Sequence, residues 1–330
     1  MGLRTGVDSA PPRVGLGCMG MSEFYGPTDD AESLAALHQA YELGYRHFDT
    51  ADMYGAGHNE RLFGRFLKEL GGRKHELLVA TKCGIRRTSG STPTVEIDSS
   101  PAYVKQACEA SLQRLGLERI DLYYLHRRNV QVPIEDTMGA MADLLAQGKI
   151  RAVGLSEVSV VSLRAACKVV TVSALQSEYS LWTRDVERDL LPACAELDVT
   201  FVAYSPLGRG FLSGEVTATP VDGKQDLRFH LPRFQPEHLA VNRALLAELA
   251  TLASELSTTP AQLALAWVLA HGANVCVIPG ARKAAHVAAN FASRALSLSP
   301  AQRARLSASF LPSRVSGERY PAGLLHTVNV

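Results

Sequence analysis

The 330-residue sequence predicts a single (β/α)8 TIM barrel, an α/β fold in which eight parallel strands alternate with helices. Short apolar runs rich in β-branched residues alternate along the chain with longer amphipathic stretches. Strands separated by helices pair in parallel, and eight such units indicate a closed barrel rather than an open doubly wound sheet. The expected strands span residues 13–19, 46–50, 77–82, 120–126, 150–156, 172–177, 199–205 and 274–279.

Signals for helix boundaries agree with these strands. An acidic capping residue opens the stretch 29–43 and Gly44 follows it, while Pro101 opens 101–115 and Gly116 follows it. Proline suits the first turn of a helix and glycine suits the position after the last turn. Both stretches are therefore predicted helices.

We expect one barrel domain over residues 1–330, with a loose polar arm at 1–12 and a tail at 313–330 that we place over the barrel mouth. The interval between the last two strands begins with a Gly- and Pro-rich polar stretch, 207–236. Structureless loops of this length are usually functional or disordered. We therefore expect long loops at the C-terminal face, and we expect this one to fold over a bound cofactor.

Charge balance and cysteine spacing exclude several function classes. The chain has 34 Lys and Arg against 33 Asp and Glu, and a net charge of +1 gives no field that would attract nucleic acid or an anionic membrane. The six cysteines lack CxxC spacing, no apolar signal segment precedes them, and no apolar run is long enough to span a bilayer. We expect a cytoplasmic protein without a metal, a nucleic-acid partner or a membrane anchor.

One motif suggests a different fold. Residues 15–20, GLGCMG, match the GxGxxG pattern of a Rossmann dinucleotide site. The third glycine of that motif should open a helix, yet a loop follows it here, and the next acidic strand end, Asp49, lies too far along the chain. We interpret 15–20 as a glycine-rich first strand and turn.

Four reactive side chains lie at the ends of the second, third and fourth expected strands, namely Asp49, Tyr54, Lys82 and His126. Each alone has an ordinary explanation as a cap, packing, a solvated cation or a core histidine. The C-terminal ends of barrel strands converge, so the four are predicted to meet there.

Together these groups can protonate a carbonyl oxygen. The ammonium of Lys82 is expected to lower the pKa of Tyr54 by favouring phenolate, Asp49 to hold that ammonium, and His126 to donate a hydrogen bond to the same oxygen. Protein side chains do not supply hydride, so a nicotinamide cofactor is implied.

Several blocks resemble the aldo-keto reductases, from Val14 to about Tyr320. RHFDTADMYGAGHNE at 46–60 resembles the family's Asp/Tyr signature, VATK at 79–82 its lysine block and IDLYYLH at 120–126 its histidine block. Its cofactor-binding segments are similar to GLSEVS at 154–159, LQSEYSLWTRDVE at 175–187, AYSPLGRGFLSG at 203–214 and IPGAR at 278–282. The resemblance implies a catalytic tetrad of Asp49, Tyr54, Lys82 and His126, and it points to the bacterial and plant branch that includes plant alkaloid aldehyde reductases.

The resemblance also implies a site for NADPH/NADP+. Ser156 and Gln176 would hold the nicotinamide carboxamide, and Tyr204 would stack on the ring. The other implied positions line the pyrophosphate channel or approach the 2′-phosphate and adenine: Ser205, Leu207, Gly208, Gly210, Gly280, Arg282, Lys283, His286 and Asn290. Departures from the family pattern bear on cofactor affinity and NADPH selectivity: Glu157 for a common Asn, His286 for a common Arg and Ala289 for a common Glu.

Two features near the expected site have alternative interpretations. Cys83 follows Lys82 and is either a reactive thiol or, as we favour, small packing filler. The pair Arg127 and Arg128 is expected to be solvated, and the alternative is contact with an acidic or phosphate-bearing substrate.

The predicted function is NADPH-dependent reduction of an aldehyde or ketone to the alcohol, with Tyr54 as proton donor and a small carbonyl compound as substrate. One rival takes Lys82 as the imine-forming lysine of an aldolase. Another is a nicotinamide-sensing regulatory subunit with little turnover, as the related potassium-channel β-subunits are thought to be. A homo-oligomer is compatible with the sequence.

Overall fold

Eight parallel strands form a closed barrel at the centre of the computed structural model, which describes residues 13–87, 95–216, 218–220 and 225–330. The strands follow one another around the sheet in the order β1 (Leu16–Gly17), β2 (His47–Asp49), β3 (Leu78–Cys83), β6 (Leu122–Leu125), β7 (Val153–Ser156), β8 (Val172–Glu178), β9 (Thr200–Tyr204) and β10 (Val275–Val277). The predicted arm at 1–12 lies outside the described residues.

The barrel closes where the first strand meets the last. Val14 and Gly17 form parallel bridges to Val277 and Gly280, and the N–H of Gly15 donates to the Val277 carbonyl at 2.8 Å. A Cβ on Gly17 would lie 2.8 Å from the Ile278 carbonyl oxygen, so this close approach requires glycine. The predicted (β/α)8 fold and all eight predicted strands are confirmed, with ends that shift by a few residues.

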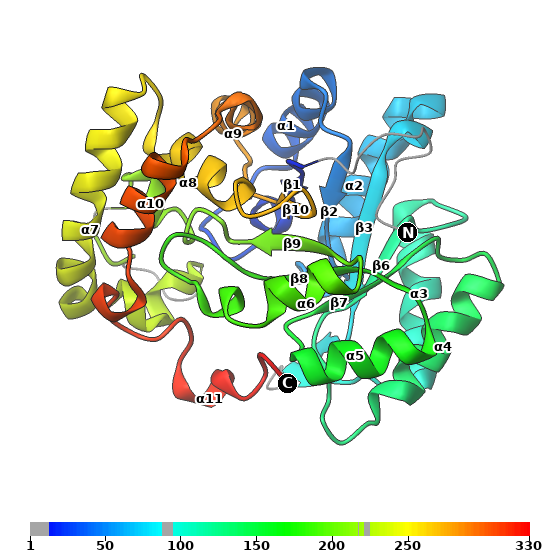
Figure 1. Cartoon of the computed structure of the whole chain (residues 1–330). Coiled ribbons are helices and arrows are strands. Elements are labelled where there is room, and N and C mark those ends of the chain that lie inside the picture. The colour runs from blue at the N-terminus through cyan, green and yellow to red at the C-terminus, as the bar shows by residue number, and fades with distance from the viewer. Residues whose placement is uncertain (1–12, 88–94, 217, 221–224) are drawn as a thin grey trace.

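Helices surround the barrel on the outside (Figure 1). Their bounds are α1 (Asp30–Leu43), α2 (His58–Leu70), α3 (Pro101–Leu115), α4 (Ile134–Ala146), α5 (Val160–Val169), α6 (Leu190–Glu196), α7 (Pro236–Glu255), α8 (Pro260–Leu269), α9 (Ala284–Ala292) and α10 (Pro300–Ser309), and the short helix α11 (Ala322–Leu325) lies in the tail. Both predicted helices are confirmed: Asp29 caps α1 by accepting from the N–H of Glu32, and Gly116 ends α3 with φ 64°.

Side chains that alternate along β3 show how the strand aims groups inward and outward. Leu78 and Ala80 belong to the small cluster inside the barrel, whereas Val79 and Cys83 belong to the large cluster between the barrel and its helices. Because successive side chains of a strand point to opposite faces, Lys82 shares the inner face with Leu78 and Ala80. The strand thus directs Lys82 into the barrel interior, near the C-terminal ends of the strands.

The GxGxxG segment behaves as a strand and turn, as interpreted from the sequence. After β1 the chain makes one 3-10 turn, Met19–Met21, and the first α-helix begins only at Asp30. No α-helix begins directly after the third glycine, Gly20, whereas a Rossmann site would place the cofactor pyrophosphate at such a helix N-terminus.

Two loops differ from the prediction. A short antiparallel hairpin, β4 (Ile85–Arg87) with β5 (Val95–Ile97), follows β3 and was not expected. The segment 207–236 contains three 3-10 helices, namely η4 (Phe211–Ser213), η5 (Leu227–His230) and η6 (Pro232–Phe234). It also pairs with the loop after β1, because Leu227 N–H donates to the Phe24 carbonyl at 2.9 Å. Residues 217 and 221–224 of this segment are outside the described part.

The tail, residues 313–330, crosses the face of the barrel that carries the C-terminal strand ends. It contains η8 (Pro312–Arg314) at its start and α11, and its last residue lies beside α5 (Figure 1). Asn329 N–H donates to the Glu157 carbonyl at 2.8 Å, and Ser159 N–H donates to the Val330 carbonyl at 2.9 Å. These two hydrogen bonds join the last two residues of the tail to the loop that directly follows β7.

No helix in the described part of the chain is both long enough and apolar enough to cross a membrane.

Candidate active site

The four residues expected to form a tetrad lie together at the C-terminal end of the barrel. Asp49 ends β2, Tyr54 follows five residues later, Lys82 is near the end of β3, and His126 directly follows β6. All four are buried, with exposed fractions of 2% for Asp49, 7% for Tyr54, 0% for Lys82 and 7% for His126. The structure therefore brings together every residue of the predicted set.

The Lys82 ammonium is the centre of this cluster. Its Nζ donates to Asp49 Oδ1, to the Thr50 carbonyl at 2.8 Å and to the Tyr54 hydroxyl at 3.3 Å. Burial alone lowers the pKa of Lys82, but Asp49 and Tyr54 raise it above its ordinary value. Lys82 is therefore a fixed cation in contact with the phenol oxygen.

The pKa of Tyr54 is shifted in the direction opposite to that predicted from the sequence. Burial raises it above its ordinary value, and Asp49 raises it further, while Lys82 and Arg127 lower it. The predicted effect of Lys82 is thus present, but the prediction of a net lowering was wrong because the cost of burying a phenolate is larger. Tyr54 holds its proton firmly in this state.

His126 faces Tyr54 edge to face, with ring centroids 5.8 Å apart and planes at 85°. Burial, followed by the charges of Lys82 and Arg127, lowers its pKa well below the ordinary value, so the imidazole is neutral. Its Nδ1 is buried and has no hydrogen-bond partner among the described residues. A neutral imidazole with unused hydrogen-bonding capacity can serve an oxygen placed beside Tyr54.

Two predicted cofactor residues occupy adjacent positions on neighbouring strands. Ser156 of β7 pairs in register with Gln176 of β8, and both are buried. Gln176 Nε2 donates to Asp49 Oδ2 at 2.8 Å, and Ser156 Oγ accepts from Arg127 Nη1 at 3.3 Å. Gln176 thereby links the predicted carboxamide site to the tetrad, a contact that the sequence did not suggest.

The predicted pyrophosphate segment, 205–210, is a sharply turned loop after β9. Ser205, Gly208 and Gly210 all have left-handed backbone, with φ of 47°, 56° and 91°. A Cβ on Gly208 would lie 2.4 Å from Trp182 Nε1, so glycine is required there for space as well as for conformation. The carbonyl of Leu207 accepts from the N–H of Gly210 at 3.1 Å.

The predicted phosphate residues cluster at the N-terminus of α9. Lys283 is the N-cap residue and makes no side-chain cap, and Arg282 directly precedes it. Arg282 Nη1 donates to the Pro27 carbonyl at 2.7 Å, and His286 is exposed with its Nε2 3.8 Å from Glu215 Oε1. Gly280 is exposed beside them. An uncapped helix N-terminus flanked by cations fits a phosphate group.

Asn290 and Ala289 lie further along α9. Asn290 is on the buried face of the helix with 3% exposure, and Ala289 is partly buried with its carbonyl accepting from Gln262 Nε2 at 3.2 Å. Asn290 thus lies on the same helix as the predicted phosphate-binding residues, but away from the N-terminus of α9 where those residues gather.

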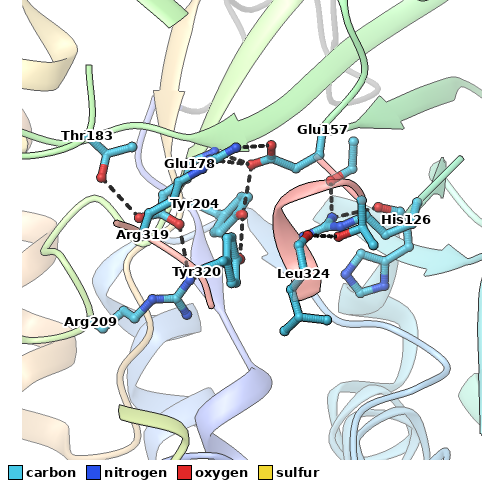
Figure 2. A network of polar contacts seen from close by, with 12 residues as sticks. His126, Glu157, Glu178, Thr183, Tyr204, Arg209, Arg319, Tyr320 and Leu324 are labelled. Atoms are coloured by element: carbon cyan, nitrogen blue, oxygen red, sulfur yellow. Dashed lines mark hydrogen bonds and ion pairs between the residues drawn. The ribbon is translucent and has the colours of Figure 1, made fainter. Parts of the chain in front are cut away.

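A second cluster of buried and half-buried side chains, which we call the mouth network, lies beside the tetrad. Its members are Glu157, Glu178, Tyr204, Arg209, Arg319 and Tyr320 (Figure 2). Sequence analysis assigned Tyr204 to the nicotinamide ring and noted Glu157 as a departure. It missed Glu178, Arg209 and Arg319, which lie in regions far apart in the chain.

Glu157 is the hub of the mouth network. Its Oε1 accepts from the Tyr204 hydroxyl at 2.8 Å and from Arg319 Nη1 at 3.1 Å, and its Oε2 accepts from Arg319 Nη2 at 2.7 Å. Burial by itself raises the pKa of Glu157, but Arg319 and Arg127 bring it below the ordinary value. Glu157 is therefore ionised, and Arg319 of the tail satisfies much of its charge.

Glu178 and Arg209 form the second pair of the network. Arg209 Nη2 donates to Glu178 Oε2 at 3.1 Å and to the Tyr320 hydroxyl at 3.0 Å. The Tyr320 and Tyr204 hydroxyls also share a hydrogen bond at 3.0 Å, and Figure 2 shows Tyr204 between Glu157 and Tyr320. Two tail residues, Arg319 and Tyr320, thus connect β7, β8 and the loop after β9.

Neither alternative feature behaves as a free surface group. Cys83 is buried on the outer face of β3, and burial raises the pKa of its thiol well above the ordinary value, so the structure supports packing filler. The expectation of a solvated arginine pair was wrong: Arg127 and Arg128 are both half-buried, and Arg128 Nη1 donates to Ser162 Oγ at 2.6 Å. The alternative from the sequence, contact with an acidic or phosphate-bearing substrate, remains open for Arg127, which lies next to His126.

Comparison with known proteins gives a consistent result. The family model described as "Aldo/keto reductase family" matches residues 13–309. A curated relative, "Probable aldo-keto reductase 1" from Glycine max, is 41% identical over 315 residues, covering 95% of this chain and 90% of the relative.

Solved structures share the fold over almost their full lengths. A glycerol dehydrogenase from Gluconobacter oxydans has a TM-score of 0.84 and 30% identity, covering 94% of this chain and 96% of its own. An aldo/keto reductase from Klebsiella pneumoniae, solved in complex with NADP and acetate, has a TM-score of 0.74 and 27% identity, covering 97% and 98%.

Proposed function

This chain belongs to the aldo/keto reductase family, and from that membership we propose that it reduces an aldehyde or ketone to the alcohol with NADPH, using Tyr54 as the proton donor. One observation carries the proposal: buried Lys82 contacts both Asp49 and the Tyr54 hydroxyl, and His126 packs edge-on against the same tyrosine. This arrangement places an acid and a fixed cation at one point of the barrel mouth.

Tyr54 supplies the proton in this mechanism. Because burial raises its pKa, the hydroxyl keeps its proton until a carbonyl oxygen gains negative charge beside it. Bound NADPH supplies the hydride that creates this charge. The Lys82 ammonium, 3.3 Å from the phenol oxygen, then stabilises the phenolate that proton transfer leaves.

The remaining groups hold the acid and its cation in position. Asp49 and the Thr50 carbonyl fix the Lys82 ammonium, and Gln176 fixes the second oxygen of Asp49. Neutral His126 donates a hydrogen bond to the carbonyl oxygen in our proposal, and its neutrality avoids a second cation near Lys82.

The residues present fit the proposed cofactor. Ser156 and Gln176 lie side by side at the ends of β7 and β8 and carry the polar groups that a carboxamide requires. The uncapped N-terminus of α9, with Arg282 and Lys283, offers donors and positive charge to a 2′-phosphate. We propose that Tyr204 stacks on the nicotinamide ring, and that the turns at 205–210 and Gly280 accommodate the pyrophosphate.

The two rival functions receive less support. An imine-forming lysine must lose its proton, whereas Asp49 and Tyr54 raise the pKa of Lys82 and occupy its donors. A regulatory subunit has no need of a complete tetrad, yet all four tetrad side chains are in contact here. The three functions predict different results for turnover, NADPH binding and trapping with borohydride.

The test is a panel of aromatic aldehydes, dicarbonyls and pyridoxal, followed at the NADPH absorbance band with the purified chain. Our proposal expects carbonyl-dependent oxidation of NADPH and no covalent adduct on Lys82 after treatment with borohydride and substrate. Tight NADPH binding with negligible turnover over the whole panel would instead indicate the sensor. A trapped adduct at Lys82 would indicate the aldolase.

A further inference from the structure

We propose that Arg127 binds a carboxylate group of the substrate, so that this chain prefers carbonyl compounds that carry an acidic group close to the reacting carbonyl. The inference rests on the proposed reductase function and names the substrate class of that same site.

Arg127 occupies the border between the tetrad and the proposed carboxamide site. It directly follows His126 at the end of β6, and its Nη1 donates to the His126 carbonyl at 2.7 Å and to Ser156 Oγ at 3.3 Å. Both bonds use the same nitrogen and hold the guanidinium in place. Tyr204 is a further polar partner of this side chain, and Glu157 acts on its charge from a longer distance, which leaves donors of the guanidinium for a ligand.

The charges around Arg127 are already paired with each other. Lys82 pairs with Asp49, Arg319 with Glu157 at 2.7 Å, and Arg209 with Glu178 at 3.1 Å. Among the residues that the structure describes, no carboxylate lies within ion-pair distance of the Arg127 guanidinium. Arg127 is therefore a half-buried cation in the mouth whose charge is not matched by a contacting carboxylate.

The ion pairs around Arg127 leave its positive charge over. Arg209 is paired with Glu178 and Arg319 with Glu157, so the guanidinium groups of Arg127, Arg209 and Arg319 lie against two carboxylates. Removing a cation from water without a counter-ion is costly, so the site favours an anionic ligand.

The cofactor phosphates do not explain this excess at Arg127. The segments that fit the phosphates follow β9 and β10, whereas Arg127 follows β6, and β7 and β8 lie between them in the sheet. Arg127 instead adjoins His126, where the carbonyl of the substrate must lie for Tyr54 to protonate it. A planar guanidinium can bind a carboxylate through two parallel hydrogen bonds.

The experiment compares two substrates that differ in charge but hardly in shape, meta-carboxybenzaldehyde and meta-carbamoylbenzaldehyde. We expect kcat/KM of the wild-type chain to favour the carboxylate by about 10- to 100-fold, and Arg127→Gln to bring that ratio close to one. Arg127→Lys, which keeps the charge but not the paired donors, should give an intermediate ratio. The matched control is Arg128→Gln: Arg128 bonds to Ser162 instead, so its loss should leave the ratio as in the wild type.

A binding measurement complements turnover, in case the glutamine variant is slow for other reasons. Fluorescence titration of the protein–NADP+ complex with benzoate and benzamide should show a preference for benzoate that Arg127→Gln removes. A wild-type ratio near one, or an unchanged ratio in Arg127→Gln, overturns the inference. An equal loss for both aldehydes together with weaker NADPH binding would also overturn it, because it would assign Arg127 to the cofactor. Failure of every aldehyde to oxidise NADPH would instead refute the reductase function itself.

Discussion

The tetrad and the mouth network are two charged clusters that lie side by side, the first buried and the second partly buried, and they are built differently. The tetrad comes from three neighbouring strands and spans residues 49–126, and its inner ion pair, Lys82 with Asp49, is fully buried. The mouth network joins β7, β8 and the loop after β9 to Arg319 and Tyr320 of the tail. Consecutive strand ends therefore form the predicted tetrad, and segments far apart in sequence form the mouth network.

The two clusters also differ in charge balance. The tetrad pairs one cation with one anion, and its histidine is neutral. The mouth network with Arg127 included holds three guanidinium groups, those of Arg127, Arg209 and Arg319, against the two carboxylates of Glu157 and Glu178. A balanced cluster is complete without a ligand, whereas an unbalanced one gains from binding an anion. Changes in the tetrad should thus affect chemistry and folding most, and changes in the mouth should affect binding.

The largest effect is expected for Lys82→Met. Turnover should fall by at least about 100-fold, because the phenolate of Tyr54 loses its cation. The free energy of unfolding should fall by about 3–5 kcal/mol, because Asp49 becomes a buried unpaired carboxylate. Denaturant titration and steady-state kinetics measure the two effects.

The double variant Lys82→Met/Asp49→Asn sharpens this prediction. It should regain much of the stability, because no buried charge is left unpaired, but it should regain no activity. Recovery of turnover in the double variant would show that Lys82 serves only to neutralise Asp49.

Loss of the tail contact should have a smaller effect on stability. Arg319→Gln removes two charge-assisted bonds to Glu157, although Tyr204 still donates to it, and the free energy of unfolding should fall by about 1–3 kcal/mol. Limited proteolysis should cut the tail faster in this variant than in Arg314→Gln, which alters an exposed tail arginine. Equal cleavage rates in the two variants would mean that Arg319 does not hold the tail.

The cofactor preference should respond to Arg282→Ala. We expect wild-type protein to bind NADPH at least about tenfold more tightly than NADH, through charge-assisted bonds to the 2′-phosphate, and we expect the variant to lose most of that difference. Fluorescence titration with each cofactor measures it. A full preference in the variant would place the phosphate elsewhere, with His286 as the next candidate.

The smallest effect concerns Asp52, a carboxyl behind the tetrad whose Oδ1 is buried without a partner in the described structure. Burial, with the charge of Glu60, raises its pKa to about 7, far above that of an unfolded aspartate. The native state therefore keeps a proton that the unfolded state releases, and this contribution to stability is lost as pH rises through 7.

Asp52→Asn should remove this pH dependence. Between pH 5.5 and 7.5 the wild type should lose about 1–2 kcal/mol of unfolding free energy relative to the variant. Urea denaturation at the two pH values gives the difference. A gap between the two proteins that stays constant with pH would show that Asp52 is ionised throughout.

The sequence was sufficient to bring Asp49, Lys82 and His126 together, because strand periodicity and strand ends determine where these side chains lie, whereas Tyr54 lies in the turn after β2 and its assignment to the tetrad followed from the family resemblance. Lys82 continues the inner face of β3 after Leu78 and Ala80, and His126 follows an equally apolar strand. The pKa direction of Tyr54 was not predictable in the same way. This direction depends on how completely other segments bury the phenol, and the local sequence pattern around Tyr54 holds no information about that burial.

The mouth network was not predictable, for a related reason. Arg319 and Tyr320 lie in a polar tail without periodicity, and only the folded chain brings them to Glu157 and Tyr204. The hairpin Ile85–Arg87 with Val95–Ile97 was missed because its first strand carries two arginines and has no alternating apolar pattern. Within the mouth network the sequence singled out Glu157, as a departure from the family pattern, and Tyr204, as a predicted cofactor residue.

Single-turnover kinetics of two tyrosine variants test the central claim most directly, which is that Tyr54 carries the chemistry and the mouth network carries binding. Tyr54→Phe and Tyr204→Phe each remove one hydroxyl at the barrel mouth and keep the ring. With NADPH bound and an aromatic aldehyde in excess, we expect the rate of NADPH oxidation to fall by at least about 100-fold in Tyr54→Phe and by less than tenfold in Tyr204→Phe. A near wild-type rate in Tyr54→Phe would contradict the account and return Lys82 or His126 to consideration as the group that serves the carbonyl.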